Sequence, residues 1–502
     1  MVAVSDPQRD CDACAPNDLA DSFQLSRYLA ALSAFAAGAA AGVNPVVVKG
    51  TDFVDTVTNN RVMIIGVDYQ PGGQAAYDPN SHKDVLSDGA VCLRDAALLQ
   101  KLGVNTIRVY NVDPTANHDL CASIFNAAGI YMIIDVNSPQ ESINRADPGS
   151  SYTTDYLTRI FGIVEAFKNY PNTMAFFAAN EVMNDVDTAQ ANPPYIRAVQ
   201  RDLKQYIAAH SSRPIPVGYS AADVRSILQD TWSYLQCSDT NSTDADLSRS
   251  DFFGLNSYSW CGADATYTSA GYDQLVAMFA SSTIPVFFSE YGCNKPSGKP
   301  RVFNEVQSLY GTQMTGLSGG LVYEYSQEPS DYGLVILNNN GSVALRGDYD
   351  NLKGQYSKLD VKLLESTTAS QTSAQPPTCS AGLLTAGSGF TTDFTVPKQP
   401  TGAAALIKNG ISNPKNGKII ATGDLNVKQQ VFDSQGRAVK GMAVTPLNGA
   451  NAPGGPGTSG STTGTGTAAA PGATKKGAAT MLHPGSLDLL VGMLISGLVF
   501  AI

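Results

Sequence analysis

The chain has 502 residues, of which 43% are hydrophobic and 15% are charged, and its net charge at neutral pH is −11. This length is enough for one large domain with additional segments. An acidic chain with 33 lysines and arginines, and with no basic cluster, is a poor candidate for binding nucleic acid, and its charge favours solubility.

The first 42 residues are typical of a secretory signal sequence. Residues 28–42 (YLAALSAFAAGAAAG) follow Arg27, are apolar, and end in small residues that predict cleavage near Ala41 or Gly42. The run is too short to span a membrane. The polar segment 1–26 is long for such a signal, so either it is a real extension or translation starts nearer residue 27. A buried core helix is the alternative interpretation of residues 28–42.

Between residue 43 and about residue 360, short apolar runs alternate with helical stretches. The runs are rich in β-branched and aromatic residues, as is typical of strands buried on both faces. Helices are expected between them, for example over 90–102, 153–169, 196–210 and 300–315. The eight expected strands are 62–70, 106–113, 131–137, 173–181, 215–221, 252–258, 284–292 and 320–326.

Eight such repeats in about 300 residues predict a (β/α)₈ TIM barrel over residues 43–360. A doubly wound open sheet is the alternative. That fold more often carries a glycine-rich phosphate loop after its first strand, and the sequence PGG at 71–73 does not match GxGxxG.

The segments after the barrel differ in composition. Residues 361–447 contain turn signals and short alternating stretches, which predict a small β-rich appendage packed on the barrel. Residues 448–476 are rich in Gly, Ser, Thr, Pro and Ala and cannot form a core, so we expect an O-glycosylated stalk.

Residues 477–502 resemble a signal for attachment of a GPI anchor. A small triplet begins at Gly477, a polar spacer follows over 480–488, and an uncharged tail of apolar residues runs from 489 to 502. We expect the anchor at Gly477. The tail is short for a transmembrane helix, and a packed terminal helix is the alternative.

The cysteines and sequons indicate an oxidising compartment. With four histidines in the chain and one CxxC-type pair, at residues 11–14, disulfides are favoured over a zinc site, and no metal is expected. Asn241 and Asn340 begin N-glycosylation sequons, NST and NGS. The eight cysteines are Cys11, Cys14, Cys92, Cys121, Cys237, Cys261, Cys293 and Cys379.

Two carboxylates end expected strands, where the active site of a barrel lies. Glu181 ends the fourth strand and Glu290 the seventh, and retaining glycosidases use one carboxylic acid and one carboxylate in this way. The alternative is that each glutamate pairs with a basic residue, since Glu324 and Glu328 also lie near a strand end. Sugar binding is favoured by the aromatic, acidic and amide side chains at other strand ends: Gln70, Tyr110, Asp135, Asn137, Asn180, Tyr258 and Tyr323.

Motifs at several strand ends resemble one family, the fungal GPI-anchored β-1,3-glucanosyltransferases of glycoside hydrolase family 72. The resemblance covers residues 43 to about 380 and extends more loosely to 447. It is carried by GVDYQPGG, IRVYNVDP, DVNSP followed by SINRADP, AANEVMND, GLNSYSWCG, FFSEYGCN and GGLVYEYSQE.

The resemblance implies a role for each matching residue. Glu181 is expected to be the general acid/base, Glu290 the nucleophile, and Asn180 a contact of the sugar 2-hydroxyl. Donor-side contacts are expected from Gln70, Tyr110, Asp135, Asn137, Ser138, Arg145, Tyr258 and Tyr323.

On the acceptor side the resemblance implies Asp223. Two positions there depart from the family pattern. Leu228 stands where members can have arginine, with Arg225 nearby, and Ala179 stands where glycine is frequent. If the backbone at residue 179 needed a positive φ, alanine would carry a conformational cost.

Further implications concern disulfides and function. The implied pairs are Cys92–Cys121, Cys237–Cys379 and Cys261–Cys293, and the cysteine-rich glucan-binding module of some members is expected to be absent. The implied enzyme cleaves a β-1,3-glucan internally and transfers the new reducing end to a second glucan, with no cofactor. It is expected to be a monomer, anchored to the outer face of the plasma membrane and remodelling the cell wall. A hydrolase and an inactive glucan-binding wall protein are the alternatives.

Overall fold

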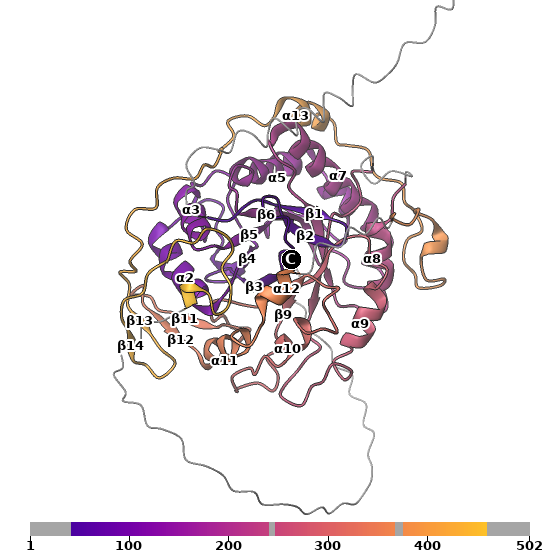
Figure 1. Ribbon diagram of the computed structural model, residues 1–502. Coiled ribbons are helices and arrows are strands. Elements are labelled where there is room, and N and C mark those ends of the chain that lie inside the picture. The colour runs from indigo at the N-terminus through magenta and orange to yellow at the C-terminus, as the bar shows by residue number, and fades with distance from the viewer. Residues whose placement is uncertain (1–41, 240–245, 367–374, 459–502) are drawn as a thin grey trace, which may run out of the picture.

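The computed structural model describes residues 42–239, 246–366 and 375–458. Eight parallel strands form a closed barrel in chain order, with the last strand pairing with the first (Figure 1). Each strand lies within or overlaps one of the eight expected runs, so the predicted TIM barrel is confirmed. The strands are β3 (Ile64–Asp68), β4 (Thr106–Val109), β5 (Tyr131–Asp135), β6 (Thr173–Asn180), β7 (Val217–Ala222), β8 (Phe253–Ser257), β9 (Val286–Tyr291) and β10 (Gly319–Val322).

A helix follows each barrel strand and packs on its outer face, which makes a ring around the barrel (Figure 1). The apolar faces of these helices and the outward-facing strand residues form the larger of two buried hydrophobic clusters. The ring consists of α2 (Gly89–Leu102), α3 (Asp119–Ala127), α5 (Thr154–Phe167), α7 (Pro193–His210), α8 (Leu228–Gln236), α9 (Tyr272–Phe279), α10 (Glu305–Leu309) and α11 (Gly347–Tyr356).

The helix predicted over residues 300–315 is much shorter in the structure. The stretch 300–315 forms only α10. The helix cannot begin earlier, because Phe303, two residues before its first residue, has a φ of 51°, which a right-handed helix cannot contain. Shorter helical turns complete the chain: η1 (Gln74–Ala76), α4 (Pro148–Ser151), α6 (Thr188–Ala191), α12 (Val361–Ser366), η2 (Ala381–Leu383), α13 (Ala403–Asn409) and η3 (Pro456–Thr458).

An N-terminal hairpin closes the barrel at the end where the strands begin. Strands β1 (Val46–Lys49) and β2 (Asp52–Asp55) pair antiparallel, and in Figure 1 they lie at the centre of the ring. From β2, Phe53 packs against Phe252 and Phe287, with ring centroids 5.7 and 5.8 Å apart, and Phe177 packs on Phe252 at 5.2 Å. This aromatic plug fills the barrel interior, so a cavity can open only at the carboxyl ends of the strands.

The additional C-terminal β-sheet is present, but it draws on two parts of the chain. Strands β11 (Val335–Leu337) and β12 (Val343–Leu345) come from the connection between β10 and α11. Strands β13 (Val431–Phe432) and β14 (Ala438–Val439) come from the C-terminal segment, and β13 pairs parallel with β12.

The rest of residues 375–458, here called the strap, runs mostly as extended chain around the outside of the helical ring (Figure 1). It crosses the helices in the reverse of their chain order, and α13 within it packs on α5 and α7. Its hydrogen bonds to the ring include Thr385 N to Asp230 Oδ1, Gln399 Nε2 to Asp202 Oδ1, Lys418 N to Asp119 Oδ1 and Asn451 Nδ2 to Gln100 O.

Three disulfides form the pairs that the resemblance implies: Cys92–Cys121, Cys237–Cys379 and Cys261–Cys293. The first joins α2 to α3, and the third joins the segments that follow β8 and β9. The second joins the end of α8 to the start of the strap and spans 142 positions of sequence.

Removing the long-range disulfide should destabilise the protein more than any exposed substitution. In the Cys237→Ser/Cys379→Ser double variant we expect the free energy of unfolding to fall by roughly 3–5 kcal/mol, because the unfolded chain regains the entropy of a large open loop. Urea titration at equilibrium measures this change. The cavity described below does not include either cysteine, so activity at 25 °C should persist. An unchanged urea midpoint would contradict the expectation.

Several expected features lie outside the described residues: the signal segment 1–41 with Cys11 and Cys14, the sequon at Asn241, and the attachment site at Gly477. Asn340 is described and exposed in the turn between β11 and β12, where its Oδ1 accepts hydrogen bonds from the amide and hydroxyl of Ser342. Within the described ranges, no helix has both the length and the apolar character needed to cross a membrane.

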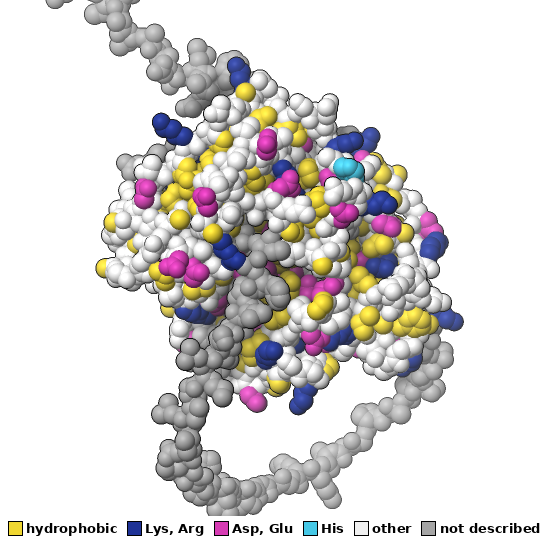
Figure 2. All heavy atoms as spheres, turned by 180° about the vertical axis from the view of Figure 1, so that it is seen from behind, with side chains coloured by type: hydrophobic (Ala, Val, Ile, Leu, Met, Phe, Trp, Pro, Cys, Tyr) yellow, Lys and Arg dark blue, Asp and Glu magenta, His cyan; other side chains and the backbone are white. Residues whose placement is uncertain are grey.

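Charged side chains are mixed on the face of the molecule seen in Figure 2. Lysines and arginines there are scattered among aspartates and glutamates, with apolar and uncharged atoms between them. On the part of this face formed by described residues, the basic side chains therefore do not gather into the stripe that would follow a phosphate backbone.

Candidate active site

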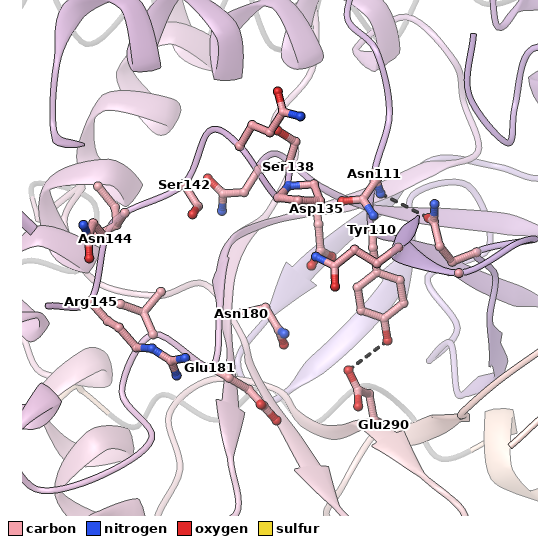
Figure 3. A pocket seen from close by; sticks show the side chains of 18 of the residues that line it. Tyr110, Asn111, Asp135, Ser138, Ser142, Asn144, Arg145, Asn180, Glu181 and Glu290 are labelled. Carbon is pink, nitrogen blue, oxygen red and sulfur yellow. Dashed lines mark hydrogen bonds between the residues drawn. The ribbon is translucent and has the colours of Figure 1, made fainter. Parts of the chain in front are cut away.

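A cavity of about 610 Å³ opens where β3 to β6, β9 and β10 end (Figure 3). All of the expected site residues line it except Tyr258 and Asp223. Its floor holds both candidate catalytic carboxylates, Glu181 and Glu290. The remaining expected residues in its wall are Gln70, Tyr110, Asp135, Asn137, Ser138, Arg145, Asn180 and Tyr323.

Glu290 lies near the end of β9 and is held by three donors. The hydroxyl of Tyr110 donates to its Oε1 at 2.9 Å, the hydroxyl of Tyr258 to its Oε2 at 2.6 Å, and Arg108 Nη1 lies 3.3 Å from Oε1. Figure 3 draws the contact between Tyr110 and Glu290 as a dashed line. Tyr258 therefore belongs to the site although it does not line the cavity.

The pKa of Glu290 is set by opposing influences. Burial raises it above the ordinary value of a glutamate, the positive charge of Arg108 lowers it, and the negative charge of Glu181 raises it further. The hydrogen bonds from Tyr258 and Tyr110 also stabilise the ionised form. The buried carboxylate thus depends on its three donors to remain charged.

Glu181 follows directly after β6 and has an unusual backbone conformation. Its φ is +49°, which is uncommon for a residue with a Cβ atom and costs about 1–3 kcal/mol. The main chain is held there by the bond from Glu181 N to Ser220 O, at 2.8 Å. The side chain is half-buried and accepts one hydrogen bond at 2.8 Å, from Asn256 Nδ2 to Oε1.

The same stretch explains Ala179. The pairing of β6 with β7 shifts between Phe177 and Ala179, which marks an irregularity in the ladder. The positive φ falls two residues later, at Glu181, and not at Ala179. Alanine is therefore accommodated without the cost that a positive φ would impose there.

Arg108 is a central residue of the site that sequence reasoning missed. It lies on β4 with no exposed surface, and its guanidinium sits between the rings of Tyr110 and Phe177, 4.3 and 4.4 Å from their centroids. It makes a two-pronged ion pair with Asp135, at 2.8 and 3.0 Å. The available signal was a charged residue in the middle of TIRV, a short run predicted to be a buried strand.

A second residue that sequence reasoning missed, Asn256, contacts both Asn180 and Glu181. Its Oδ1 accepts hydrogen bonds from the hydroxyls of Ser220 and Ser289, which fixes the amide with Nδ2 facing Asn180 and Glu181. Asn180 Oδ1 thus accepts from both Asn256 Nδ2, at 3.1 Å, and Arg108 Nη2, at 3.0 Å. Among the residues that the structure describes, none accepts a hydrogen bond from Asn180 Nδ2, so both amide hydrogens can serve a ligand in the cavity.

Asp223 lies apart from the cavity, beyond the end of β7. Its carboxylate pairs with Arg225, with Nε 2.5 Å from Oδ1, and accepts a hydrogen bond of 2.8 Å from Ser257. Leu228 is buried at the start of α8 and cannot reach the surface. The cation beside Asp223 is therefore Arg225 in this chain.

Comparison with known proteins identifies relatives over most of the chain. A family model described as glucanosyltransferase, of glycoside hydrolase family 72, matches residues 35–360. The 1,3-β-glucanosyltransferase gel2 of Aspergillus fumigatus is 53% identical over 424 residues, which cover 84% of this chain and 86% of that protein. The 1,3-β-glucanosyltransferase GAS4 of Saccharomyces cerevisiae is 43% identical over 342 residues, covering 68% and 71%.

A solved structure agrees with these relatives. Saccharomyces cerevisiae Gas2p in complex with laminaripentaose is 35% identical, covers 72% of this chain and 79% of that one, and superposes with a TM-score of 0.65. The family model matches well over half of the chain, and its range ends close to the last helix of the barrel. The chain therefore belongs to glycoside hydrolase family 72, the glucanosyltransferases.

Proposed function

We propose that this protein is a retaining β-1,3-glucan transglycosylase, which cleaves one glucan internally and transfers the new reducing end to another. The proposal is supported by the named relatives, which are 1,3-β-glucanosyltransferases, and by the Gas2p complex with a β-1,3-glucan oligosaccharide. The observation that carries it is the placement of Glu181 and Glu290 in one cavity, with different hydrogen-bond environments.

In the first step Glu290 attacks the anomeric carbon while Glu181 donates its proton to the leaving glycosidic oxygen. The bond to the leaving glucan breaks, and a glycosyl ester with Glu290 forms. In the second step a hydroxyl of the acceptor glucan attacks that carbon, Glu181 takes the hydroxyl proton, and Glu290 leaves as a carboxylate. Two displacements at one carbon retain the β configuration.

The assignment of the two roles rests on the donors around each carboxylate. Glu290 has Arg108 and two tyrosine hydroxyls, which stabilise negative charge, whereas Glu181 has the single amide of Asn256. Glu181 is also only half-buried and lines the open cavity, so it can face the leaving glycosidic oxygen of a bound glucan. These contacts therefore support Glu290 as the nucleophile and Glu181 as the acid/base.

The wall of the cavity is proposed to bind the donor glucan. Asn180 has free amide hydrogens for the sugar 2-hydroxyl, and Tyr323 offers an aromatic face. Asp135, bound to Arg108, has a fixed orientation, and the segment from Asn137 to Arg145 forms the far wall (Figure 3). Gln70, Ser138 and Tyr110 complete the donor contacts. Asp223 with Arg225 is proposed to contact the acceptor.

The products formed from a single reduced laminari-oligosaccharide test the proposal. Transfer gives products both longer and shorter than the starting oligosaccharide, because the released fragment of one molecule is replaced by a second molecule. If only shorter products form, the protein is a hydrolase. If no product forms while the oligosaccharide binds, the protein is a glucan-binding protein without this activity.

Removing one donor from the nucleophile should change the pH dependence of the reaction. In Tyr258→Phe, Glu290 loses a hydrogen bond that lowers its pKa, so the pKa of Glu290 rises. The nucleophile must be ionised. As the pH is lowered, the variant should therefore lose activity at a less acidic pH than the wild type does, so the acidic limb of kcat/KM should move to higher pH. Tyr310→Phe is the control, since the hydroxyl of Tyr310 forms hydrogen bonds with the backbone oxygens of Ile64 and Gly320 and does not contact Glu290. A limb that does not move in Tyr258→Phe would contradict the contact.

We also propose that the protein acts as a monomer at the outer face of the plasma membrane, held by a GPI anchor at Gly477, and remodels the cell wall. The support is the sequence at both ends of the chain together with the family's pattern. Release of the protein from intact cells by a phosphatidylinositol-specific phospholipase C tests the anchor. Retention after this treatment, with loss on removal of residues 489–502, would indicate a spanning tail instead.

A further inference from the structure

Another carboxyl group, that of Asp68, lies next to the site and has no part in the mechanism above. Asp68 is the last residue of β3, is fully buried, and pairs in register with Arg108 on β4. Both of its carboxyl oxygens are shielded from solvent, and neither makes a well-formed hydrogen bond with a described residue. Its carboxyl group also interacts with the hydroxyl of Tyr110, although not in well-formed hydrogen-bond geometry.

The hydrogen bonds of Arg108 leave no N–H group of its guanidinium free to donate to Asp68. Its Nε donates to Asp135, its Nη1 donates to Ser289 O and to Glu290, and its Nη2 donates to Asp135 and to Asn180. These five bonds use all five N–H groups of the guanidinium. One positive charge therefore faces the carboxyl groups of Asp135, Glu290 and Asp68, and its donors reach only the first two.

An ionised Asp68 would be a buried negative charge with no donor from Arg108, and it would compete with Glu290 for the single hydrogen of the Tyr110 hydroxyl. Such a charge is far less stable than the neutral acid. In agreement, burial and the charge of Glu290 raise the pKa of Asp68 well above that of an ordinary aspartate, against the opposing influences of Arg108 and of the hydrogen-bonding interaction with Tyr110. The titratable groups that interact with Asp68 are Arg108, Tyr110, Asp135, Tyr258, Glu290, Tyr323 and Tyr356.

We propose that Asp68 is a neutral carboxylic acid in the working enzyme and acts as a positioning residue, donating its proton in a hydrogen bond to the hydroxyl oxygen of Tyr110. The Tyr110 hydroxyl has one hydrogen, which it donates to Glu290 Oε1. If Asp68 were ionised, the Tyr110 hydroxyl could donate this hydrogen to either of two carboxylates, Asp68 or Glu290. A protonated Asp68 is itself a donor to the Tyr110 oxygen, so Glu290 is the carboxylate that accepts the Tyr110 hydrogen.

This proposal rests on the role proposed for Glu290, and two variants of nearly equal size test it. Asp68→Asn keeps a neutral donor, whereas Asp68→Leu keeps the shape and removes the donor. We expect kcat to fall by less than about tenfold in Asp68→Asn, and by about a further tenfold in Asp68→Leu, the value of one hydrogen bond. Equal kcat values in the two variants would overturn the donor role.

The pH profile separates a neutral Asp68 from an ionised one. A neutral Asp68 has no charge to lose, so the acidic limb of kcat/KM in Asp68→Asn should stay where it is in the wild type. If Asp68 is ionised, its removal lowers the pKa of Glu290, and the limb moves to lower pH by about one unit, as expected for a buried neighbouring charge. That movement would refute the proposal.

Infrared spectroscopy gives a measurement that does not depend on activity. The spectrum of the wild type at pH 7 should contain a carbonyl band of a protonated carboxyl group that is missing from the spectrum of Asp68→Asn. Absence of this difference would overturn the proposal even if glucan transfer is observed. If the band is present but no glucan is transferred, the protonation of Asp68 stands and the proposed function fails.

Discussion

Glu290→Gln should abolish glucan transfer, with a fall in kcat of at least about 10⁴-fold. Glutamine has no negative charge with which to attack the anomeric carbon, and removal of a nucleophile generally leaves only the residual effects of binding and electrostatics. Glu181→Gln should cost less, about 10²–10⁴-fold, which is the usual contribution of a general acid/base. Both are measured as the rate of product formation from a reduced laminari-oligosaccharide.

An activated donor distinguishes the two glutamates. A laminari-oligosaccharide with a dinitrophenyl leaving group needs no protonation to depart, so Glu181→Gln should form the glycosyl-enzyme at a rate close to that of the wild type. Glu290→Gln should not form it at all. If Glu290→Gln releases dinitrophenol in a rapid first turnover and Glu181→Gln does not, the two roles must be exchanged.

Glu305→Gln is the matched control for both variants. Glu305 is also a buried glutamate, and burial raises its pKa to about 7, but it begins α10 and does not line the cavity. Its replacement by glutamine should leave glucan transfer unchanged. A large loss of activity in this control would mean that the effect of the other two substitutions comes from burial of a glutamine and not from lost chemistry.

The barrel could be predicted from the sequence because each strand is a short apolar run with β-branched and aromatic residues, and such runs repeat eight times. The hairpin of β1 and β2 was missed, since residues 46–55 contain Lys49, Asp52 and Asp55 and do not form a continuous apolar run. The strap was also not foreseen. Extended chain that follows a protein surface has no periodicity, and its hydrogen bonds go to residues far away in the sequence.

The positions of the two glutamates could be predicted for a physical reason as well. Strand ends in a barrel meet at one face, so residues such as Glu181 and Glu290 are brought together by topology alone. The groups that control their charge could not be predicted in the same way. The groups in question lie inside barrel strands: Arg108 in β4, Asn256 in β8 and Asp68 in β3. Their roles depend on which neighbour each side chain faces across the barrel.

Arg108→Lys should produce the second large effect, on both activity and stability. A lysine ammonium has three donors at one point and cannot reach Asp135, Asn180 and Glu290 together, whereas the flat guanidinium of Arg108 does. We expect kcat/KM to fall by more than about 100-fold, because two contacts of the nucleophile side lose their geometry, each worth about tenfold or more. The free energy of unfolding should fall by about 1–3 kcal/mol, because the lysine keeps the positive charge but leaves buried acceptors of the guanidinium without a donor.

Arg197→Lys separates these two effects. Arg197 on α7 is equally buried, and its guanidinium binds Asp246, Ser248 and the backbone oxygens of Tyr234 and Cys237, away from the cavity. We expect this variant to lose stability similarly in urea titration while the acidic limb of its kcat/KM stays at the wild-type pH. In Arg108→Lys the limb should move to higher pH, because the cation that lowers the pKa of Glu290 is displaced. A normal pH profile in Arg108→Lys, with loss of stability alone, would reduce Arg108 to a structural residue and would leave the two tyrosines as the groups that keep Glu290 ionised.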